Sequence, residues 1–333
     1  MNDRIAVLGA GAWGTALAVL LMRDGRRVTL CARRTELCEA IRVTHENSAY
    51  LPGIPLPDAL ELSADWRAVV RDADTIVMTV PSRHARTAIA PITREIRPGA
   101  LLVSATKGVE EGTLHTMSAM MRAVAPRGVE IAVLSGPGFA AEVARGKPAA
   151  LVAAASEEPV AIRTRELFAS RTLRVYSSTD IVGVELAGAA KNVIAIAVGA
   201  SDGLELGSSA RAAVITRGLA EIMRLSVAGG GRRETIAGLA GLGDLVLTCT
   251  GDQSRNRAVG LRLGRGERPD VQSEDPGKPV AEGIANARSV RALAARLGVE
   301  MPIVDGVYRA LYEAAAPDTI VDELLSRELK AEF

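Results

Sequence analysis

A glycine-rich turn near the start of the chain limits the possible folds more than any other feature. Gly9, Gly11 and Gly14 form a GxGxxG pattern that follows the apolar run 5–8 and opens an apolar stretch with helical spacing. In such a unit the first glycine permits a tight turn, the second lets the backbone approach a pyrophosphate, and the third lets helix and strand pack closely. A second strand pattern at 27–31 completes a βαβ unit. We therefore expect a dinucleotide site with its phosphates at the helix N-terminus.

The first half of the chain alternates short β-branched runs with amphipathic stretches. The predicted strands are 4–8, 27–31, 74–80, 100–104, 131–134, 149–154 and 173–176, and the predicted helices between them are 12–23, 84–96, 113–124 and 159–169. This alternation predicts an α/β doubly wound (Rossmann) fold with a parallel sheet. The proline-containing segment 44–58 is expected to be a loop against the sheet edge.

After residue 176 the strand signals stop and helical spacing continues to the end. The predicted helices are 180–198, 211–227, 235–239, 254–263, 284–297, 303–312 and 319–330. Because single cores stop growing at roughly 250–300 residues, a chain of 333 residues is expected to form two domains. We predict a dinucleotide-binding Rossmann domain at 1–178 and an all-α substrate and catalytic domain at 179–333.

Composition argues against several classes of function. The 40 basic and 39 acidic residues leave a net charge of +1, and aromatic residues make up 3%, so nothing indicates a nucleic-acid partner. No apolar run reaches the ~18 residues of a membrane helix, and we expect the first apolar run to be a strand rather than the core of a secretory signal. Both points favour the cytoplasm and no membrane insertion. Cys31, Cys38 and Cys249 lack metal-ligand spacing; we expect buried, reduced thiols and no metal.

The residues after the second strand bear on the choice of cofactor. An acidic residue there would hold a ribose 2′-hydroxyl, whereas an arginine accommodates a 2′-phosphate. The chain has Arg33 and Arg34 at this point, and the nearest acid, Glu36, lies in the following helix. We therefore expect NADP(H) to be preferred, with NAD(H) possible. The alternative is that both arginines belong to a solvated helix start.

Polar residues at several apolar positions indicate a catalytic constellation. Lys107 ends a buried strand, and Lys191 lies inside an apolar helix; since long cations are seldom buried unless paired, Lys191 either extends to solvent or serves a site, and we favour the site. Asp244 lies in a glycine-rich bend, and Arg255 lies in a cluster of donors, Ser254 to Asn256. Each also has a simpler explanation: Asp244 as a helix cap and Arg255 as a surface ion pair.

The chain resembles the bacterial NAD(P)-dependent glycerol-3-phosphate dehydrogenases, in order and spacing, from residue 5 to about residue 302. The segments that carry the resemblance are GAGAWGTALA, ATKG, SGPGFAAE, GAAKNVIAIAVGASDGLELG, RGLAEI, GLAGLGDLVLTCTGDQSRNR and VAEG. The resemblance implies reversible hydride transfer between a nicotinamide and C2 of sn-glycerol 3-phosphate or dihydroxyacetone phosphate, serving phospholipid synthesis. It also implies a homodimer.

The resemblance implies roles for individual residues. Lys191 is expected to be the general acid/base, aided by Asp244, and desolvation beside another cation would lower its pKa towards neutrality. The substrate-binding residues implied are Lys107, Gly136, Gly138, Lys191, Asp244, Ser254, Arg255 and Asn256. The cofactor-binding residues implied are Gly9, Gly11, Ala12, Trp13, Gly14, Arg33, Arg34, Tyr50, Lys107, Ala140, Arg255, Val280 and Glu282.

One position departs from the family. Gly138 stands where the family usually has Ser or Thr, so a substrate-binding hydroxyl is missing. A lost hydrogen bond to an anion costs about 1.5–3 kcal/mol if nothing replaces it. We therefore expect a higher KM for the triose phosphate than in relatives that have the hydroxyl. Two alternatives remain: a β-hydroxy acid dehydrogenase of related architecture, and a dinucleotide sensor without catalysis. The SRNR and GLGD segments argue against the first, and the joint presence of Lys107, Lys191 and Asp244 argues against the second.

Overall fold

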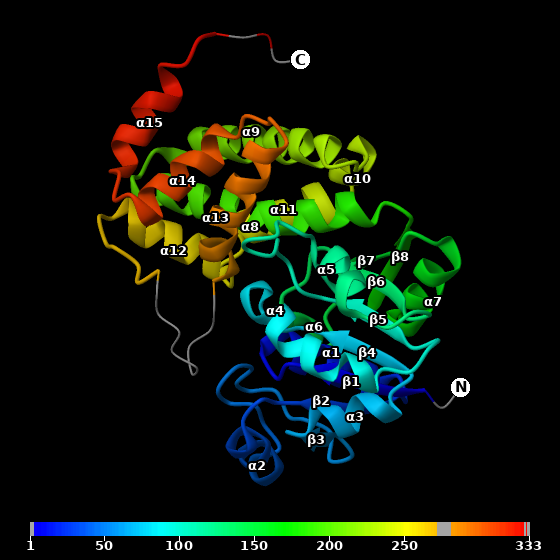
Figure 1. Ribbon diagram of the computed structural model, residues 1–333. Coiled ribbons are helices and arrows are strands. Elements are labelled where there is room, and N and C mark those ends of the chain that lie inside the picture. The colour runs from blue at the N-terminus through cyan, green and yellow to red at the C-terminus, as the bar shows by residue number, and fades with distance from the viewer. Residues whose placement is uncertain (1–2, 272–280, 330, 332–333) are drawn as a thin grey trace.

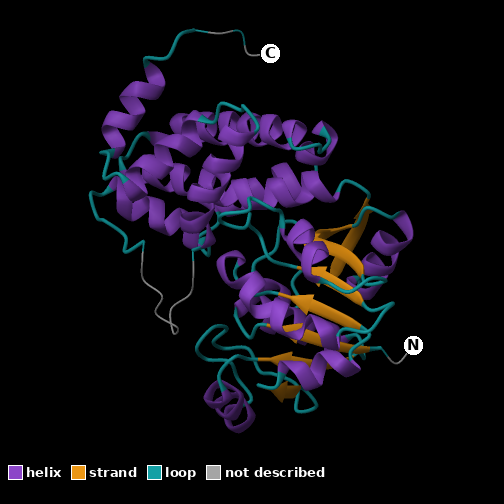
Figure 2. Cartoon of the chain, in the orientation of Figure 1, coloured by secondary structure: helices purple, strands orange, loops and turns teal. Residues whose placement is uncertain are grey.

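The computed structural model describes residues 3–271, 281–329 and 331. These residues form a twisted sheet with helices on both faces, which lies beside a helical bundle (Figures 1 and 2). The last strand of the sheet ends at Ser178, and the first helix of the bundle begins at Ile181. The two parts predicted from the sequence are therefore both present.

The eight strands are arranged in the order β3-β2-β1-β4-β5-β6-β7-β8. Their bounds are β1 (Arg4–Leu8), β2 (Arg27–Cys31), β3 (Glu61–Ser63), β4 (Thr75–Met78), β5 (Leu101–Ser104), β6 (Glu130–Ser135), β7 (Ala149–Ala154) and β8 (Leu173–Ser178). At the centre, Leu8 of β1 pairs with both Cys31 and Met78. Strands β4 and β5 are buried along their whole length, as expected of parallel strands covered on both faces.

The predicted parallel sheet is present, with one antiparallel pairing. Strand β7 runs antiparallel to β6, while β7 and β8 are parallel to each other. Parallel neighbours need a long crossover, usually through a helix, but only the five-residue helix α6 (Ala140–Ala144) lies between β6 and β7. The chain therefore returns along the sheet in the opposite direction.

The helices around the sheet cover both of its faces. They are α1 (Ala12–Arg23), α2 (Thr35–Thr44), α3 (Trp66–Asp72), α4 (Ser82–Ile89), the 3₁₀ helix η1 (Ala90–Glu95), α5 (Met117–Val124), α6 and α7 (Glu158–Phe168). The predicted loop 44–58 packs its Leu51 and Ile54 against Ala16 of α1 and Ala144 of α6. In the same loop the buried Asn47 amide donates to the carbonyl oxygen of Ala10 at 2.9 Å. The loop thus supports the glycine turn directly.

The bundle is built around one long helix, α8 (Ile181–Gly203), which is buried on nearly all sides. Around it lie α9 (Gly207–Ala228), α10 (Arg233–Ala237), the π-helical turn η2 (Leu239–Gly243), α11 (Asp244–Thr250), α12 (Arg255–Gly264), α13 (Glu282–Arg296), α14 (Pro302–Tyr312) and α15 (Pro317–Leu325). Backbones of α8 and α12 touch: a Cβ at Gly199 would lie 2.0 Å from the carbonyl oxygen of Arg257, and one at Gly260 would lie 2.0 Å from that of Ile196. These glycines allow the two helices to pack in backbone contact.

Helix α8 also corrects the expectation that no segment is long and apolar enough to span a membrane. Its 23 residues include an 18-residue window with a mean hydropathy of 1.7, which meets that criterion by length and composition. In the structure, however, 89% of this window is buried inside the protein. A helix that is apolar on all sides is typical of a buried core as well as of a membrane. The three cysteines are buried and unpaired, as predicted.

Candidate functional site

A cleft of about 560 Å³ lies where the carboxyl ends of β1, β4 and β5 face the bundle. This is the edge of an open α/β sheet at which ligands bind. The predicted site residues that line it are Gly9, Gly11, Ala12, Trp13, Arg33, Arg34, Tyr50, Lys107, Gly138, Ala140, Lys191, Asp244, Ser254, Arg255, Asn256 and Glu282. Of the others, Gly14 and Gly136 lie outside this lining, and Val280 lies outside the described residues.

The glycine turn at one end of the cleft leaves room for a phosphate group. Gly9 has a φ of +112°, a conformation that favours glycine, and a Cβ at Gly14 would lie 2.0 Å from the Gly9 carbonyl oxygen. A Cβ at Gly11 would meet nothing within 4 Å, so the backbone is open there. Helix α1 has no side-chain cap and no acidic residue in its first turn. Its free N–H groups are therefore available to an anion, and the residues fit a dinucleotide.

Two exposed arginines follow β2 at the same end of the cleft. Arg33 and Arg34 both line it, and Arg34 immediately precedes α2. Within the described part of the chain neither makes an ion pair, while Glu36 lies in the first turn of α2. Unpaired guanidinium groups at this position can bind a phosphate bidentately.

The deepest feature of the cleft is a carboxylate shared by two lysines. Asp244, the first residue of α11 and 1% exposed, accepts hydrogen bonds at 2.7 Å from Lys191 Nζ at Oδ1 and from Lys107 Nζ at Oδ2. Lys191 also donates to Thr248 Oγ1 at 2.6 Å, and Lys107 donates to the carbonyl oxygen of Gly136 at 3.1 Å. Lys107 follows strand β5, whereas Lys191 and Asp244 belong to the bundle. One carboxylate thus joins the two parts of the protein at the site.

Burial changes the proton affinity of Lys191. Its pKa is lowered from the usual 10.5 to about 8, because desolvation and, less strongly, the nearby charge of Lys107 outweigh the opposite effect of Asp244. Lys191 can therefore exchange a proton near neutral pH. Glu282 lies close to this cluster, and burial raises its pKa, against the lowering effects of Arg255, Lys107 and Lys191.

The start of α12 forms another part of the cleft lining. Ser254 Oγ caps this helix by accepting from the backbone N–H of Arg257 at 3.2 Å. The side chain of Asn256 donates to Asn192 Oδ1 and accepts from the backbone N–H of Gly283, both at 2.9 Å. Arg255 makes no hydrogen bond or ion pair with the described residues, and its side chain lines the cleft. Its free guanidinium and the positive end of the helix point to an anion site.

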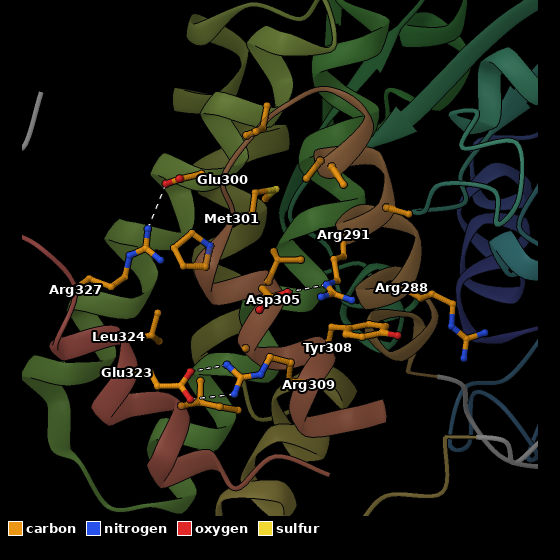
Figure 3. Close-up of a pocket in the computed structure, with 18 residues that line it drawn as sticks. Arg288, Arg291, Glu300, Met301, Asp305, Tyr308, Arg309, Glu323, Leu324 and Arg327 are labelled. Atoms are coloured by element: carbon orange, nitrogen blue, oxygen red, sulfur yellow. Dashed lines mark hydrogen bonds and ion pairs between the residues drawn. The ribbon is translucent and has the colours of Figure 1, made fainter. Parts of the chain in front are cut away.

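The charged residues that line this cleft differ from those that line a second, larger pocket. Six cationic residues line the cleft against two acidic ones, which favours phosphate-bearing ligands. The other pocket, of about 720 Å³, lies between α13, α14 and α15 (Figure 3). All its arginines are already paired, Arg288 with Glu111, Arg291 with Asp305, Arg309 with Glu323 and Arg327 with Glu300. That pocket therefore offers no free cation to a phosphate.

Position 138 is crowded by a neighbouring aromatic ring. A Cβ on Gly138 would lie 3.3 Å from Trp13 Cη2, so the ring occupies space beside the missing side chain. Trp13 Nε1 is buried and has no hydrogen-bond partner among the described residues. Such an unsatisfied donor beside the cleft is consistent with a site built for a polar ligand.

Several residues of the cleft were not predicted from the sequence. Thr248 lies one helical turn after Asp244, a spacing that would have revealed it had α11 been predicted. Thr79, which donates to the Gly9 carbonyl oxygen at 2.9 Å, and Arg83 were not singled out either. His84 also lines the cleft, and its Nε2 accepts a hydrogen bond from Arg83 Nε at 3.0 Å.

The fold and the cleft define a class, the dinucleotide-dependent dehydrogenases that join a Rossmann-type sheet to a helical bundle. Two family models match, described as the N-terminus and the C-terminus of NAD-dependent glycerol-3-phosphate dehydrogenase, over residues 4–161 and 180–322. The chain therefore belongs to the NAD-dependent glycerol-3-phosphate dehydrogenase family, and the resemblance inferred from its motifs is confirmed.

Individual relatives are similar over their full length. The Geobacter sulfurreducens protein named glycerol-3-phosphate dehydrogenase [NAD(P)+] is 50% identical over 335 residues, covering 100% of this chain and 99% of its own. Its Syntrophobacter fumaroxidans counterpart is 48% identical, covering 99% and 97%. A crystal structure of glycerol-3-phosphate dehydrogenase from Coxiella burnetii has a TM-score of 0.92 at 41% identity, covering 98% of this chain and 99% of that one.

Proposed function

We propose that the protein is an NAD(P)-dependent sn-glycerol-3-phosphate dehydrogenase that interconverts dihydroxyacetone phosphate and sn-glycerol 3-phosphate. The observation that carries this proposal is the lysine pair bridged by Asp244, which lines the same cleft as the glycine turn and the guanidinium of Arg255. This set of groups suits a substrate with a carbonyl next to a phosphate-bearing carbon. The relatives that carry this activity in their names support the same assignment.

The substrate phosphate is proposed to bind at the start of α12. Arg255 supplies a fork of donors, and the first N–H groups of the helix supply a positive field. Because Asn256 is fixed by Asn192 and Gly283, it holds this end of the helix in place. The bound phosphate would then direct C2 of the substrate towards Lys191.

Lys191 is proposed to donate the proton that the C2 oxygen gains during reduction. A lysine with a pKa of about 8 is largely protonated at pH 7 yet can lose its proton readily, as a general acid/base requires. Lys107 adds a second positive charge that stabilises the developing oxyanion. Asp244 holds both ammonium groups in position. The nicotinamide, when bound, supplies or accepts the hydride at C2.

The cofactor is proposed to be NADP(H) in preference to NAD(H), because Arg33 and Arg34 are exposed and unpaired at the end of β2. We further propose that residues 1–178 and 179–333 act as the cofactor and substrate domains, and that the protein is a cytoplasmic homodimer. In the cell it would make sn-glycerol 3-phosphate for phospholipid synthesis. A β-hydroxy acid dehydrogenase is disfavoured by the family match, and a dinucleotide sensor by the intact lysine–carboxylate pair.

One assay tests the activity: oxidation of NADPH and of NADH is followed with dihydroxyacetone phosphate, and with a β-keto acid as comparison. We expect turnover with the triose phosphate alone and a higher kcat/KM for NADPH. Turnover with the keto acid alone, or with neither substrate, would refute the proposal. Lys191→Ala should bind the cofactor but lose nearly all turnover; a near-normal kcat would overturn the role of this lysine.

A further inference from the structure

Helix α13 carries a buried amide that contacts both lysine-bearing segments. Asn286 is 0% exposed, and its Nδ2 donates to the carbonyl oxygen of Lys107 at 3.1 Å and to that of Ala189 at 3.2 Å. Ala189 lies two residues before Lys191 in α8. One NH₂ group therefore ties the segment of the first lysine to the helix of the second.

The chemistry of this contact requires an amide. One nitrogen reaches both carbonyl oxygens, so it must carry two hydrogens. Among the short side chains only asparagine has such an NH₂ group. The amide orientation is set by these acceptors, and Asn286 Oδ1 consequently faces a place without a partner among the described residues. A buried acceptor left unsatisfied costs about 1–3 kcal/mol, so packing alone does not explain an asparagine here.

The backbone segment that carries Lys107 is also tightly enclosed by neighbouring side chains. A Cβ at Gly108, the residue after Lys107, would lie 2.4 Å from Ser82 Oγ and 2.8 Å from Asn286 Oδ1. The backbone thus passes through a slot between α4 and α13. At Gly188, a Cβ would lie 3.1 Å from Ser135 Oγ and 3.6 Å from Lys107 Cγ, so α8 borders the lysine side chain as well.

We propose that Asn286 is a positioning residue that sets the placement of Lys107 relative to Lys191 by bridging their two backbone segments. Its role is indirect, because its own side chain does not line the cleft. Without the bridge, Lys107 moves away from Asp244, and Lys191 loses a neighbouring positive charge. This inference rests on the proposed function.

The test compares Asn286→Leu, which keeps the branched outline of the side chain with bulkier methyl groups and has no donor, with Asn286→Ser, which keeps one donor. We expect kcat for dihydroxyacetone phosphate to fall about 10- to 100-fold in the leucine variant and by a smaller factor in the serine variant. The KM for NADPH should change little in either variant. Ser289→Ala removes a polar group from the buried side of the same helix and serves as the matched control. Gly108→Ala adds a methyl group in the slot, next to Lys107, and should lower kcat by a similar factor.

A second readout does not depend on turnover. The chain has five lysines, so their ¹³Cε signals can be titrated individually by NMR, with Lys191→Arg assigning the signal of interest. In both Asn286 variants the pKa of Lys191 should rise, because Lys107 no longer opposes its protonation. A purely structural role would lower the melting temperature without moving this pKa or separating kcat from KM, and that result would overturn the inference.

The proposed function and the role of Asn286 can fail separately. If the wild-type protein has no activity, the proposed function fails. If the wild type is active and the folded Asn286 variants have the same kcat and the same Lys191 pKa, only the role of Asn286 is refuted.

Discussion

Replacing Asp244 by asparagine tests the electrostatics of the site most directly. The amide keeps the shape of the carboxylate, but it removes a negative charge that lies 2.7 Å from the ammonium nitrogens of both Lys107 and Lys191. An asparagine can accept from only one of the two lysines, because its NH₂ group would face the other. The buried Lys191 and the partly buried Lys107 would then be left with no shared counter-ion.

The size of the effect follows from Coulomb's law. At an effective dielectric constant of 20, a charge pair about 4 Å apart is worth about 4 kcal/mol, which corresponds to a pKa change of roughly 2–3 units. Since Asp244 raises the pKa of Lys191, its loss should lower that pKa from about 8 to about 5–6. The protonated fraction of Lys191 at pH 7 would then fall by about 10-fold or more, and kcat for reduction with it.

The assay is kcat for dihydroxyacetone phosphate reduction measured from pH 5 to pH 10. In the wild type, kcat should decline above about pH 8 as Lys191 loses its proton. In Asp244→Asn this decline should begin at a lower pH, so part of the activity returns on acidification. Asp252→Asn removes a fully exposed carboxylate from the neighbouring loop and should leave the profile unchanged. A decline that stays near pH 8 in Asp244→Asn would refute the reasoning.

Three further outcomes are expected. The double variant Arg33→Ser with Arg34→Ser should lower kcat/KM for NADPH about 10- to 100-fold and leave that for NADH nearly unchanged; equal losses would contradict a 2′-phosphate site. Gly11→Ala should keep the wild-type melting temperature but raise the cofactor KM, whereas Gly14→Ala, whose methyl overlaps the turn, should lower the melting temperature. Gly138→Ser should lower the KM for dihydroxyacetone phosphate by less than about 10-fold, since the adjacent indole ring must shift; an unchanged KM would show that no hydroxyl is missed.

The elements that the sequence predicted well are those with strong local signals. Strands β1, β2 and β7 and helix α1 have the predicted bounds, because their apolar runs are bounded by glycine or charged residues. The short elements β3, α3, α6 and α11 were not predicted, since segments of three to seven residues carry too little periodicity. The direction of β7 depends on how its connection packs, which the spacing of apolar residues does not record.

The site was predicted in part for a similar reason. Lys191 and Asp244 stood out because charged residues in apolar surroundings are conspicuous at the level of sequence. Thr248 and Asn286 were not found, because threonine and asparagine are common in helices and become informative only through what they contact. That Ser254 and Asn256 are occupied by hydrogen bonds within the protein, while Arg255 is not, likewise depends on tertiary structure.

The carboxylate of Asp244 links the arrangement of the two parts of the protein to protonation. Lys107 approaches it from the sheet, and Lys191 approaches it from the bundle. Any motion that withdraws the sheet from the bundle takes Lys107 away and increases the affinity of Lys191 for a proton. By reciprocity, a proton on Lys191 favours opening of the cleft and its loss favours closure. For any such motion, proton uptake by Lys191 and separation of the sheet from the bundle would share one coupling free energy, carried by the carboxylate of Asp244.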